Sequence, residues 1–534
     1  MKTEWNIKID GRDMDHLEII EALMKSRGIK DLKSFLNPTE DSMIPFEEMS
    51  GLEEGYQIIL DTIENGGRFV VFFDVDTGGN TAGTIMTRYL RNFTDKINTY
   101  INEGKKHGAE DFPLEMLDKN TTLIIVDSLN NDPDVYKRIL DTGVKLIVCD
   151  HHLIEQKLLD ANLPFCLISS ANNYPNPALS GAGVVFKFCQ YIDDATWNDY
   201  ADEFWDLAAA GIIADMCNVS EQSSENRYIC YKGFQNQKNP AISKINGSFG
   251  FDSKAVSFGV APLVNAACRM NENEKAMRLF LSDDSKEINS LIKALKGCKE
   301  EQNKIVADQM ENLIKQGDAQ LDQKCMYFFI DTDSETAGLM GNKLLEKYQR
   351  PLFVLRTSGN SYTGSMRAVG LKDFAKIVND TGIGSCMGHE LAAGAFIPID
   401  RFEEFKNKIE EALKDIEFVQ SYDVDIQLDS EQITDELIRQ IKEINKISGS
   451  GFPAITVMIG DVSDYEVGNM SGGKHLKIST PNVTFIKWNF NGWDYMWDLD
   501  GKEFYGVGQL DSGFFGRKYY RQLILDDFKF EDIW

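Results

Sequence analysis

Short apolar runs, each followed by an acidic residue, recur through the first part of the chain. They cover residues 68–74, 122–127 and 144–150, and they are rich in β-branched and aromatic residues between turn signals. Buried parallel strands have this pattern. Residues 84–90 and 134–140 lie between these runs and have helical spacing of their apolar positions. The alternation predicts a doubly wound α/β domain with a parallel sheet, in which ligands bind at the carboxyl ends of the strands.

A long charged segment follows this domain. Residues 283–320 favour a helix and carry apolar residues at near-helical spacing, which predicts a connecting helix, although a core helix has a similar pattern. Apolar runs at 326–330 and 351–355 then predict strands of a second α/β unit, with residues 364–367 as a loop.

The last part of the chain differs in character. Short runs joined by Gly, Asn and Asp turns predict the strands of a small all-β barrel at 454–459, 475–479, 483–488 and 519–525. Aromatic residues are interleaved with Lys and Arg across 485–497 and 516–521. Because rings stack on bases and cations pair with phosphates, this pattern is typical of a platform for single strands, although about half of the rings are expected in the barrel core.

The composition is that of a folded but strongly acidic protein. The 534 residues include 56 Lys and Arg and 84 Asp and Glu, for a formal net charge of −28. Such a chain repels nucleic acid on average, so a bound strand needs a local basic channel. Lys105, Lys106 and His107 form one small basic patch. The nine cysteines are scattered singly and no apolar stretch approaches a membrane span, which favours a reduced, cytoplasmic protein without membrane contact.

Acidic residues and adjacent histidines mark candidate metal ligands. Asp74 and Asp76 end the first predicted strand, Asp127 ends another, and Asp215 follows a run of small and apolar residues. Two of the six histidines are adjacent in the Asp-His-His segment 150–152. Taken alone, this segment is equally compatible with a turn that carries two solvated histidines. Several acids at one sheet edge repel one another unless cations bridge them, so the whole set favours a two-metal hydrolytic site for manganese or magnesium.

The ordered set of motifs resembles the DHH phosphoesterase superfamily and, within it, the RecJ-like single-stranded-DNA exonucleases. The matching segments are 34–38 (SFLNP), 74–81 (DVDTGGNT), 126–127 (VD), 150–152 (DHH), 179–184 (LSGAGV), 212–215 (IIAD), 225–227 (ENR), 261–269 (APLVNAACR), 364–367 (GSMR), 388–394 (GHELAAG) and 473–477 (GKHLK). The resemblance implies four parts: an N-terminal segment with the DHH catalytic domain at 1–280, a connecting helix at 281–320, a DHH-associated domain at 321–420 and an OB-like domain at 421–534.

Carried over position by position, the resemblance assigns roles to individual residues. The expected ligands of two Mn²⁺ or Mg²⁺ ions are Asp74, Asp76, Asp127, His151 and Asp215. Asp127 would bridge the ions and His152 would face the scissile phosphate, so these two are the expected catalytic residues. The residues expected to bind substrate are Asn265, Arg269, Ser365, Arg367, Gly388, His389, Lys474, Lys477, Arg517, Lys518 and Arg521. For Asn265 and Arg269 a structural role is equally well supported.

The chain departs from the family pattern at two positions. The family's first motif has a third acid where this chain has Gly78, and a glycine supplies no ligand oxygen, so one ion loses a carboxylate. The explanations are a deliberately introduced change, a degenerate non-catalytic protein, or compensation by a neighbour such as Asn80. Because the rest of the site is intact, we expect an enzyme lineage that is impaired in this chain. Met387 replaces a second glycine of the family pattern.

These observations lead to three functional hypotheses. The first is a metal-dependent single-stranded-DNA exonuclease that, by resemblance, cuts from the 5′ end to mononucleotides in recombination, repair or replication, with a single-strand-binding protein or helicase as partner. The second is a non-catalytic DNA-binding scaffold, supported by Gly78 alone. The third is a phosphodiesterase of short oligonucleotides or cyclic dinucleotides. Relatives of that kind lack the 261–269 segment and the barrel-like tail, so the presence of both argues against it.

Overall fold

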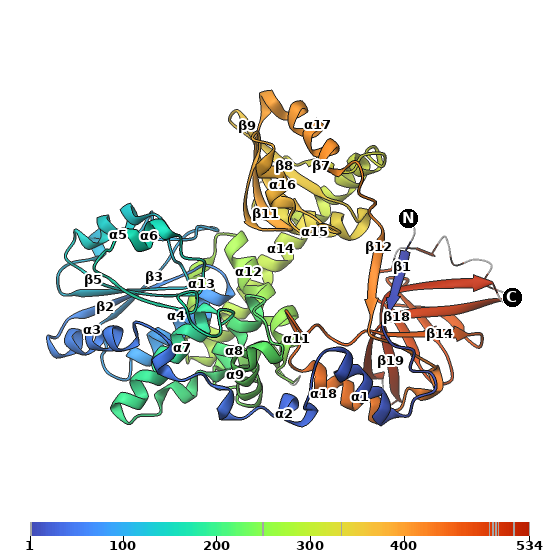
Figure 1. Cartoon of the computed structure of the whole chain (residues 1–534), viewed down its shortest axis with the longest axis horizontal. Coiled ribbons are helices and arrows are strands. Elements are labelled where there is room, and N and C mark those ends of the chain that lie inside the picture. Colours follow the sequence, from blue (N-terminus) through green and yellow to red (C-terminus); the bar gives the residue numbers. More distant parts are fainter. Residues whose placement is uncertain are drawn as a thin grey trace.

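The computed structural model describes residues 3–532 except 248, 249, 333, 491, 494, 495, 497, 498, 500, 516 and 517. Three domains make up the chain (Figure 1). The first α/β domain lies at the left of the view, the second at the top, and the β-rich C-terminal domain at the right. No helix in the described part of the chain combines the length and apolar character needed to cross a membrane.

The sheet of the first domain has five strands and is entirely parallel, as the apolar runs predict. Its order is β3-β2-β4-β5-β6. The strands are β2 (Arg68–Phe73), β3 (Ile97–Ile101), β4 (Thr121–Val126), β5 (Lys145–Asp150) and β6 (Cys166–Ser169). Alternate residues of β2 enter two different hydrophobic clusters, because both faces of the sheet are covered. The acids that follow β2 and β4, and Asp150 at the end of β5, therefore lie at one edge of the sheet.

The two predicted helices between these strands are confirmed as α4 and α5. Helix α4 comes so close to the sheet that a Cβ on Gly83 would lie 2.3 Å from the Phe73 ring. The helices of this domain are α3 (Leu52–Glu64), α4 (Thr77–Leu90), α5 (Pro133–Leu140), α6 (Gln156–Asp160), α7 (Gly181–Thr196), α8 (Trp205–Ala214), α9 (Ser224–Gln235), α10 (Pro240–Asn246), α11 (Ser253–Ala255), α12 (Ala261–Arg269) and α13 (Asn273–Leu281).

The predicted connecting helix is confirmed as α14 (Ser285–Asp318), which is 34 residues long. It leads into the second domain, whose sheet order β10-β11-β9-β8-β7 contains one parallel and three antiparallel pairs. The elements are β7 (Met326–Phe329), α15 (Ala337–Tyr348), β8 (Leu352–Ser358), β9 (Ser361–Arg367), α16 (Phe374–Asp380), β10 (Ser385–His389), β11 (Ala392–Pro398) and α17 (Phe402–Leu413). Strands β7 and β8 confirm the two predicted strands.

The prediction of a loop at residues 364–367 is wrong. These residues form the second half of β9, between β8 and β11. Gly364 packs against the neighbouring backbone, where a Cβ would lie only 2.0 Å from the Val354 carbonyl oxygen. The glycine suggested a loop from local pattern, whereas the sheet requires it because no side chain fits between the strands.

The C-terminal domain is built on one seven-stranded sheet, in the order β13-β14-β18-β19-β17-β16-β15. Its strands are β13 (Ile426–Leu428), β14 (Val457–Val462), β15 (Glu466–Met470), β16 (His475–Ser479), β17 (Thr484–Lys487), β18 (Lys502–Phe515) and β19 (Lys518–Asp532). The four predicted strands correspond to β14, β16, β17 and β19. The all-β prediction needs one correction, since helix α18 (Asp435–Asn445) packs its buried apolar residues within this domain.

The first elements of the chain, β1 and α1, lie against the C-terminal domain and not the first one (Figure 1). Strand β1 (Thr3–Ile7) pairs in parallel with β12 (Gln420–Val424), and α1 (His16–Ser26) contacts α18. Helix α2 (Leu32–Leu36) follows. The sequence placed residues 1–280 in one unit, and the pairing of β1 corrects this for the first residues, because a local pattern does not reveal a partner more than 400 residues away.

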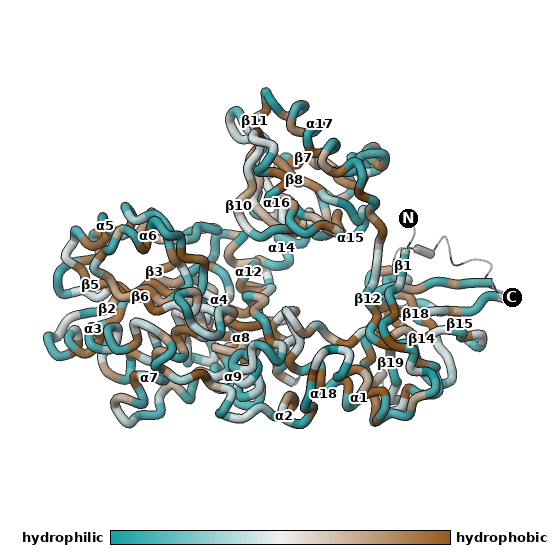
Figure 2. The backbone as a smooth tube through the Cα atoms, viewed as in Figure 1, coloured by the Kyte–Doolittle hydropathy of each residue, from teal (hydrophilic) through white to brown (hydrophobic). Residues whose placement is uncertain are grey.

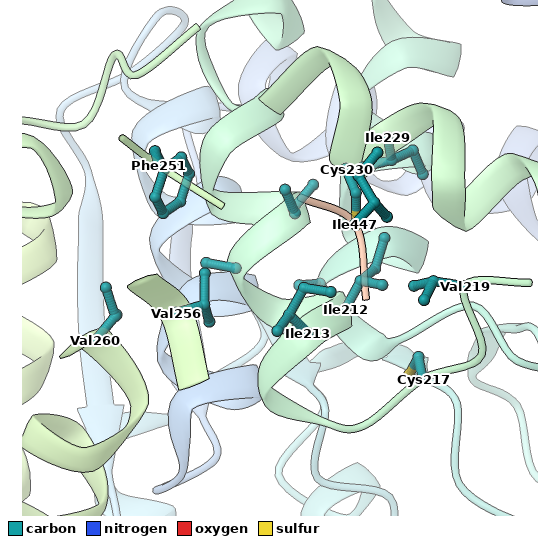
Figure 3. Close-up of a cluster of buried hydrophobic side chains, with 14 of the residues drawn as sticks. Ile212, Ile213, Cys217, Val219, Ile229, Cys230, Phe251, Val256, Val260 and Ile447 are labelled. Atoms are coloured by element: carbon teal, nitrogen blue, oxygen red, sulfur yellow. The ribbon is translucent and has the colours of Figure 1, made fainter. Parts of the chain in front are cut away.

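One hydrophobic core runs through the first and the C-terminal domains without a break. Figure 3 shows Ile447, which follows α18, among the side chains of Ile212, Ile229 and Cys230. The second domain has separate cores of its own, and hydrophobic residues gather along its strands β7 and β8 (Figure 2). The first and C-terminal domains therefore form one packed unit, whereas the second domain is joined to it through α14 and the segment before β12.

Candidate metal centre and nucleic-acid path

The loop after β2 presents two aspartates at the edge of the parallel sheet. Asp76 caps α4, since its carboxylate accepts a 2.9 Å hydrogen bond from the Gly79 amide. The side-chain amide of Asn80 donates to the carbonyl oxygens of Val75, at 3.2 Å, and Asp76, at 2.7 Å. Asn80 therefore holds the backbone that carries Asp76.

Asp127 follows β4 in a left-handed backbone conformation with a φ of 59°. It is buried, and a Cβ on Gly181 at the start of α7 would lie 2.1 Å from Asp127 Oδ1. The glycine therefore leaves room for the carboxylate. A buried aspartate in an unfavourable backbone region marks a position where function, rather than stability, determines the residue.

The two histidines of the Asp-His-His segment contact different carboxylates. His151 Nε2 lies 3.2 Å from Asp127 Oδ1, and His152 Nδ1 lies 2.8 Å from Asp150 Oδ1. Asp150 also accepts hydrogen bonds from the amides of Leu129, at 2.7 Å, and His152, at 2.6 Å. Burial opposes ionisation of Asp150, but the hydrogen bond and positive charge of His152 outweigh it and lower the pKa of Asp150 to about 2. The ionised Asp150 thus orients the His152 ring.

Two sets of possible ligand atoms meet at Asp127. The acidic cluster consists of Asp76, Asp127 and Asp215, whose oxygens lie within 4.8 Å of one another, and Asp127 forms a second such set with His151 and His152. Burial, and then the charge of the neighbouring carboxylates, raises the pKa of Asp127 and Asp215, whereas Asp76 is exposed. Asp215 Oδ2 is buried and accepts no hydrogen bond from the described residues. Mutually repelling, unsatisfied carboxylates of this kind fit divalent cations.

Asp74 lies beside this cluster but has other partners. Its Oδ1 accepts a 2.9 Å hydrogen bond from Ser128 Oγ and lies 3.1 Å from His107 Nδ1. The hydrogen bond and charge of Asp74 outweigh burial and raise the pKa of His107 to about 9. The His107 ring also lies 4.8 Å from that of His152. Sequence reasoning placed His107 only in a basic patch, because nothing local indicates that its loop folds onto the metal centre.

Two adjoining pockets lead away from the acidic cluster. The inner pocket, of about 310 Å³, is lined by Asp74, Val75, Asp76, Lys105, His107, Asn265, Cys268 and Arg269. The outer pocket, of about 490 Å³, extends along the second domain. Lys105 and Arg269 line both pockets, so the two form one path between the first and second domains.

Cations dominate the outer pocket. Arg367 on β9 donates to Ser365 Oγ at 3.0 Å and to Asn342 Oδ1 at 2.6 Å, and a Cβ on Gly338 would lie 2.6 Å from its guanidinium. Burial, and then the charge of Arg269, lowers the pKa of Arg367. Since two half-buried guanidinium groups repel one another here, the pocket favours an anion such as a phosphate between them.

Comparisons with known proteins agree with this geometry. The family description "DHH family, N-terminal domain" matches residues 68–212, and "DHHA1 domain" matches residues 322–415. Residues 68–212 and 322–415 thus resemble the two domains of the DHH superfamily, in the order found in RecJ-like proteins. It is 28% identical over 462 residues to the putative SPbeta prophage-derived single-strand DNA-specific exonuclease YorK of Bacillus subtilis, with 79% of each protein covered. It is 25% identical to single-stranded-DNA-specific exonuclease RecJ of the same species, covering 87% of this chain and 61% of that protein.

The fold extends the likeness to the whole chain. The crystal structure of RecJ in complex with Mn²⁺ from Thermus thermophilus superimposes with a TM-score of 0.79 at 21% identity, covering 99% of this chain and 80% of that one. A second structure, exonuclease RecJ bound to manganese, covers 70% of this chain with a TM-score of 0.56 at 24% identity. The C-terminal domain is therefore part of the shared fold.

Gly78 lies directly against the acidic cluster of this RecJ-like chain. A Cβ at this position would lie 2.3 Å and 2.4 Å from the two Asp215 oxygens and 2.6 Å from Asp127 Oδ2. The volume that the family's third acid would enter is thus filled by two other carboxylates. The cluster retains three acids whose oxygens lie within 4.8 Å of one another, and Asn80 supports it through the backbone of Asp76.

Two predicted substrate residues of the second domain do not line either pocket. Gly388 and His389 lie at the end of β10, paired with β11, and both are exposed. The neighbouring Met387 lines the outer pocket instead and is 84% exposed. Ser365, Arg367, Asn265 and Arg269 do line the pockets, so the structure brings these four predicted residues together.

The predicted cations of the C-terminal domain have different surroundings. Lys474 is exposed in the turn before β16, and Lys477 Nζ lies 5.2 Å from the centre of the Tyr520 ring. Arg521 bonds Asp435 at 2.6 Å and the Ile433 carbonyl at 2.9 Å, so it fastens β19 to the start of α18. Arg517 and the side chain of Lys518 lie outside the described residues.

Proposed function

We propose that this protein is a metal-dependent exonuclease of single-stranded DNA. The observation that carries the proposal is the acidic cluster, with its unsatisfied Asp215 oxygen, at one end of a path lined by Lys105, Arg269 and Arg367. The names of the RecJ and YorK relatives support the substrate. Cleavage from the 5′ end to mononucleotides, a role in recombination, repair or replication, a cytoplasmic location, and a helicase or single-strand-binding protein as partner belong to the same proposal.

The residues of the site have distinct tasks. Asp76, Asp127, Asp215 and His151 would hold divalent cations, with Asp127 shared between the two sets of ligand atoms. Bound cations supply charge that neutralises the phosphodiester and Lewis acidity that activates water. Arg269 and Arg367 orient the strand through its phosphates. Asp150 holds His152 by Nδ1, which leaves Nε2 free to donate a proton or hydrogen bond to a phosphate oxygen.

In this proposal, Gly78 makes the site bind divalent cations more weakly than a site with an acid at this position, but the site still binds them. The missing acid removes one negative ligand, but three carboxylates and His151 remain within reach of a cation. We therefore expect activity that requires more Mn²⁺ than a site with a fourth carboxylate.

The test is the degradation of 5′- and 3′-labelled single-stranded DNA across a series of Mn²⁺ concentrations. The proposal is supported if the 5′-labelled strand releases labelled mononucleotide from the start of the reaction and the 3′-labelled strand releases it only near the end. Asp127→Asn is the matched control, since it removes one charge from the cluster at nearly constant volume. Degradation that survives in Asp127→Asn, or that persists in the presence of a chelator, contradicts it.

A non-catalytic DNA-binding scaffold is the second candidate, and Gly78 is the observation that favours it. Tight binding of a single strand without degradation at any Mn²⁺ concentration would establish this alternative. A phosphodiesterase of short oligonucleotides or cyclic dinucleotides would instead cleave those substrates faster than a long strand. The extensive C-terminal domain, packed into the core of the first domain, favours the long strand.

A further inference from the structure

We propose that Arg227 is a positioning residue that locks the C-terminal domain onto the first domain, so that a long strand held by the C-terminal domain is aligned with the acidic cluster. The inference rests on the proposed exonuclease function. It assigns a task to two segments whose role is otherwise open, 34–38 and 225–227, and to the loop that follows α18.

Arg227 is a buried cation whose hydrogen-bond partners are carbonyl oxygens. It is 2% exposed on α9. Its Nε donates to the Phe35 carbonyl at 2.7 Å, and its Nη1 donates to the carbonyls of Val219, at 3.3 Å, and Ile447, at 3.1 Å. These oxygens belong to the N-terminal segment, the first domain and the loop after α18. A single guanidinium group thus joins three segments that are far apart in sequence.

Aromatic rings close the site around this group. The Arg227 guanidinium carbon lies 3.4 Å from the centre of the Phe35 ring and 5.3 Å from that of Phe452, and the two rings are 4.8 Å apart. Burial lowers the pKa of Arg227 to about 9. Burying a charge without a carboxylate partner is costly. An apolar side chain would fill this volume without the free-energy cost of burying a charge. The fixed fork of donors therefore indicates that the three segments bonded by Arg227 must be held in one relative position.

The junction is connected to the acidic cluster by a short turn. Asp215 directly follows α8 as its C-cap, and the turn there is closed by hydrogen bonds from the amide of Met216 to the Ile213 carbonyl and from that of Cys217 to the Ile212 carbonyl, at 3.2 and 3.0 Å. Four residues after Asp215, the Val219 amide donates to the Ser450 carbonyl at 3.0 Å. The position of the loop after α18 is therefore coupled through a few rigid bonds to a predicted metal ligand.

This arrangement makes the distance from the C-terminal domain to the acidic cluster constant. The core continues behind Ile447 from the first domain into the C-terminal domain, which holds the two domains together at this point (Figure 3). A strand that engages both places gains from their fixed separation, because the second contact is then intramolecular. A trinucleotide that occupies only the two pockets gains nothing from it. The loss of Arg227 should therefore harm long strands selectively.

The experiment compares Arg227→Met, Arg227→Lys and Phe452→Leu with the wild type on a trinucleotide and on a long single strand. We expect kcat/KM for the long strand to fall about tenfold in Arg227→Met, with a change of less than about twofold for the trinucleotide. Arg227→Lys should recover part of the loss, since it keeps the charge but not the fork. Phe452→Leu removes the ring beside Arg227 but keeps an apolar side chain there. It provides a second test of the same junction if Arg227→Met does not fold.

Lys254→Ala is the matched control. It removes an exposed ion pair with Asp511, of 3.6 Å, that crosses the same interface and should contribute little. Equal losses for both substrates in the Arg227 and Phe452 variants would indicate a merely structural role and overturn the inference. No loss for either substrate would also overturn it.

Small-angle scattering separates this inference from the proposed function. Arg227→Met or Phe452→Leu should increase the radius of gyration relative to the wild type, whether or not the wild type degrades DNA. If the wild type degrades no DNA but the variants expand, the proposed function fails and the domain lock stands. If the wild type degrades DNA and the variants neither expand nor lose selectivity for long strands, the lock fails alone.

Discussion

Replacing Gly78 with alanine tests whether the acidic cluster is built around a glycine. The new Cβ would lie 2.3 Å from the nearest Asp215 oxygen, whereas ordinary contact begins at 3.4 Å. The Asp215 carboxylate must therefore retreat by about 1 Å, and a misplacement of this size in a catalytic site costs about 100-fold in rate. We expect Gly78→Ala to lower kcat/KM on single-stranded DNA by about this factor and to weaken Mn²⁺ binding, because Asp127 is displaced as well.

Gly78→Asp adds the same Cβ together with a further carboxylate. In the metal-free protein this charge joins acids that already repel one another, and burial has already raised the pKa of Asp127 and Asp215, so we expect a lower Tm than for Gly78→Ala. Cations relieve this repulsion and gain a ligand, so Mn²⁺ should raise the Tm of Gly78→Asp more than that of the wild type or of Gly78→Ala.

The assays are release of a 5′ label across a Mn²⁺ series, calorimetric titration of Mn²⁺, and thermal unfolding with and without the ion. Activity and Mn²⁺ affinity that stay unchanged in Gly78→Ala would refute the packing argument, since they would show that the carboxylates move at no cost. An equal effect of Mn²⁺ on the Tm of both variants would show that a carboxylate at this position does not reach the ions.

The remaining predictions concern other parts of the site. Asp127→Asn should abolish DNA degradation and most of the rise in Tm on adding Mn²⁺, as measured by unfolding with and without the ion. Arg367→Met should raise KM about tenfold or more with a smaller change in kcat, because it removes a fork that grips phosphate; an unchanged KM contradicts that assignment. Asp150→Asn should cost about 2 kcal/mol of unfolding free energy at neutral pH, since the wild-type pKa is lowered from 3.8 to about 2. A carboxylate whose pKa is lower in the folded protein stabilises the fold at pH values above its unfolded pKa of 3.8. The difference in unfolding free energy between the wild type and Asp150→Asn should therefore disappear as the pH falls through about 2. Urea unfolding at several pH values would detect this change.

Much of the first domain could be predicted from sequence because its signals are local. Runs of buried apolar residues form parallel strands where helices cover both faces of the sheet. The acids after β2 and β4, and Asp150 at the end of β5, meet at one edge because parallel strands end there together. The length and spacing of α14 were likewise evident. The resemblance then placed Asp127 and His151 in one site, and the structure brings them within 3.2 Å.

Other features depended on contacts between distant segments. Glycine at position 364 indicated a loop by local pattern, but the neighbouring strand is what requires it. His107 carried no signal beyond its charge, yet the folding of its loop brings it to Asp74. The pairing of β1 with β12 and the three carbonyl partners of Arg227 likewise join segments that the sequence leaves far apart.

The sequence by itself determined β2, β4, β5 and α14, and the set of acids and histidines that hold the chemistry, because periodicity and residue type are properties of short segments. Tertiary structure alone decided which of those residues touch. It brought Asp215 and Asp127 into the space beside Gly78, set Arg367 opposite Arg269, and packed the C-terminal domain onto the first domain. The physical reason is that burial, mutual repulsion and close packing act between side chains in space, whatever their separation along the chain.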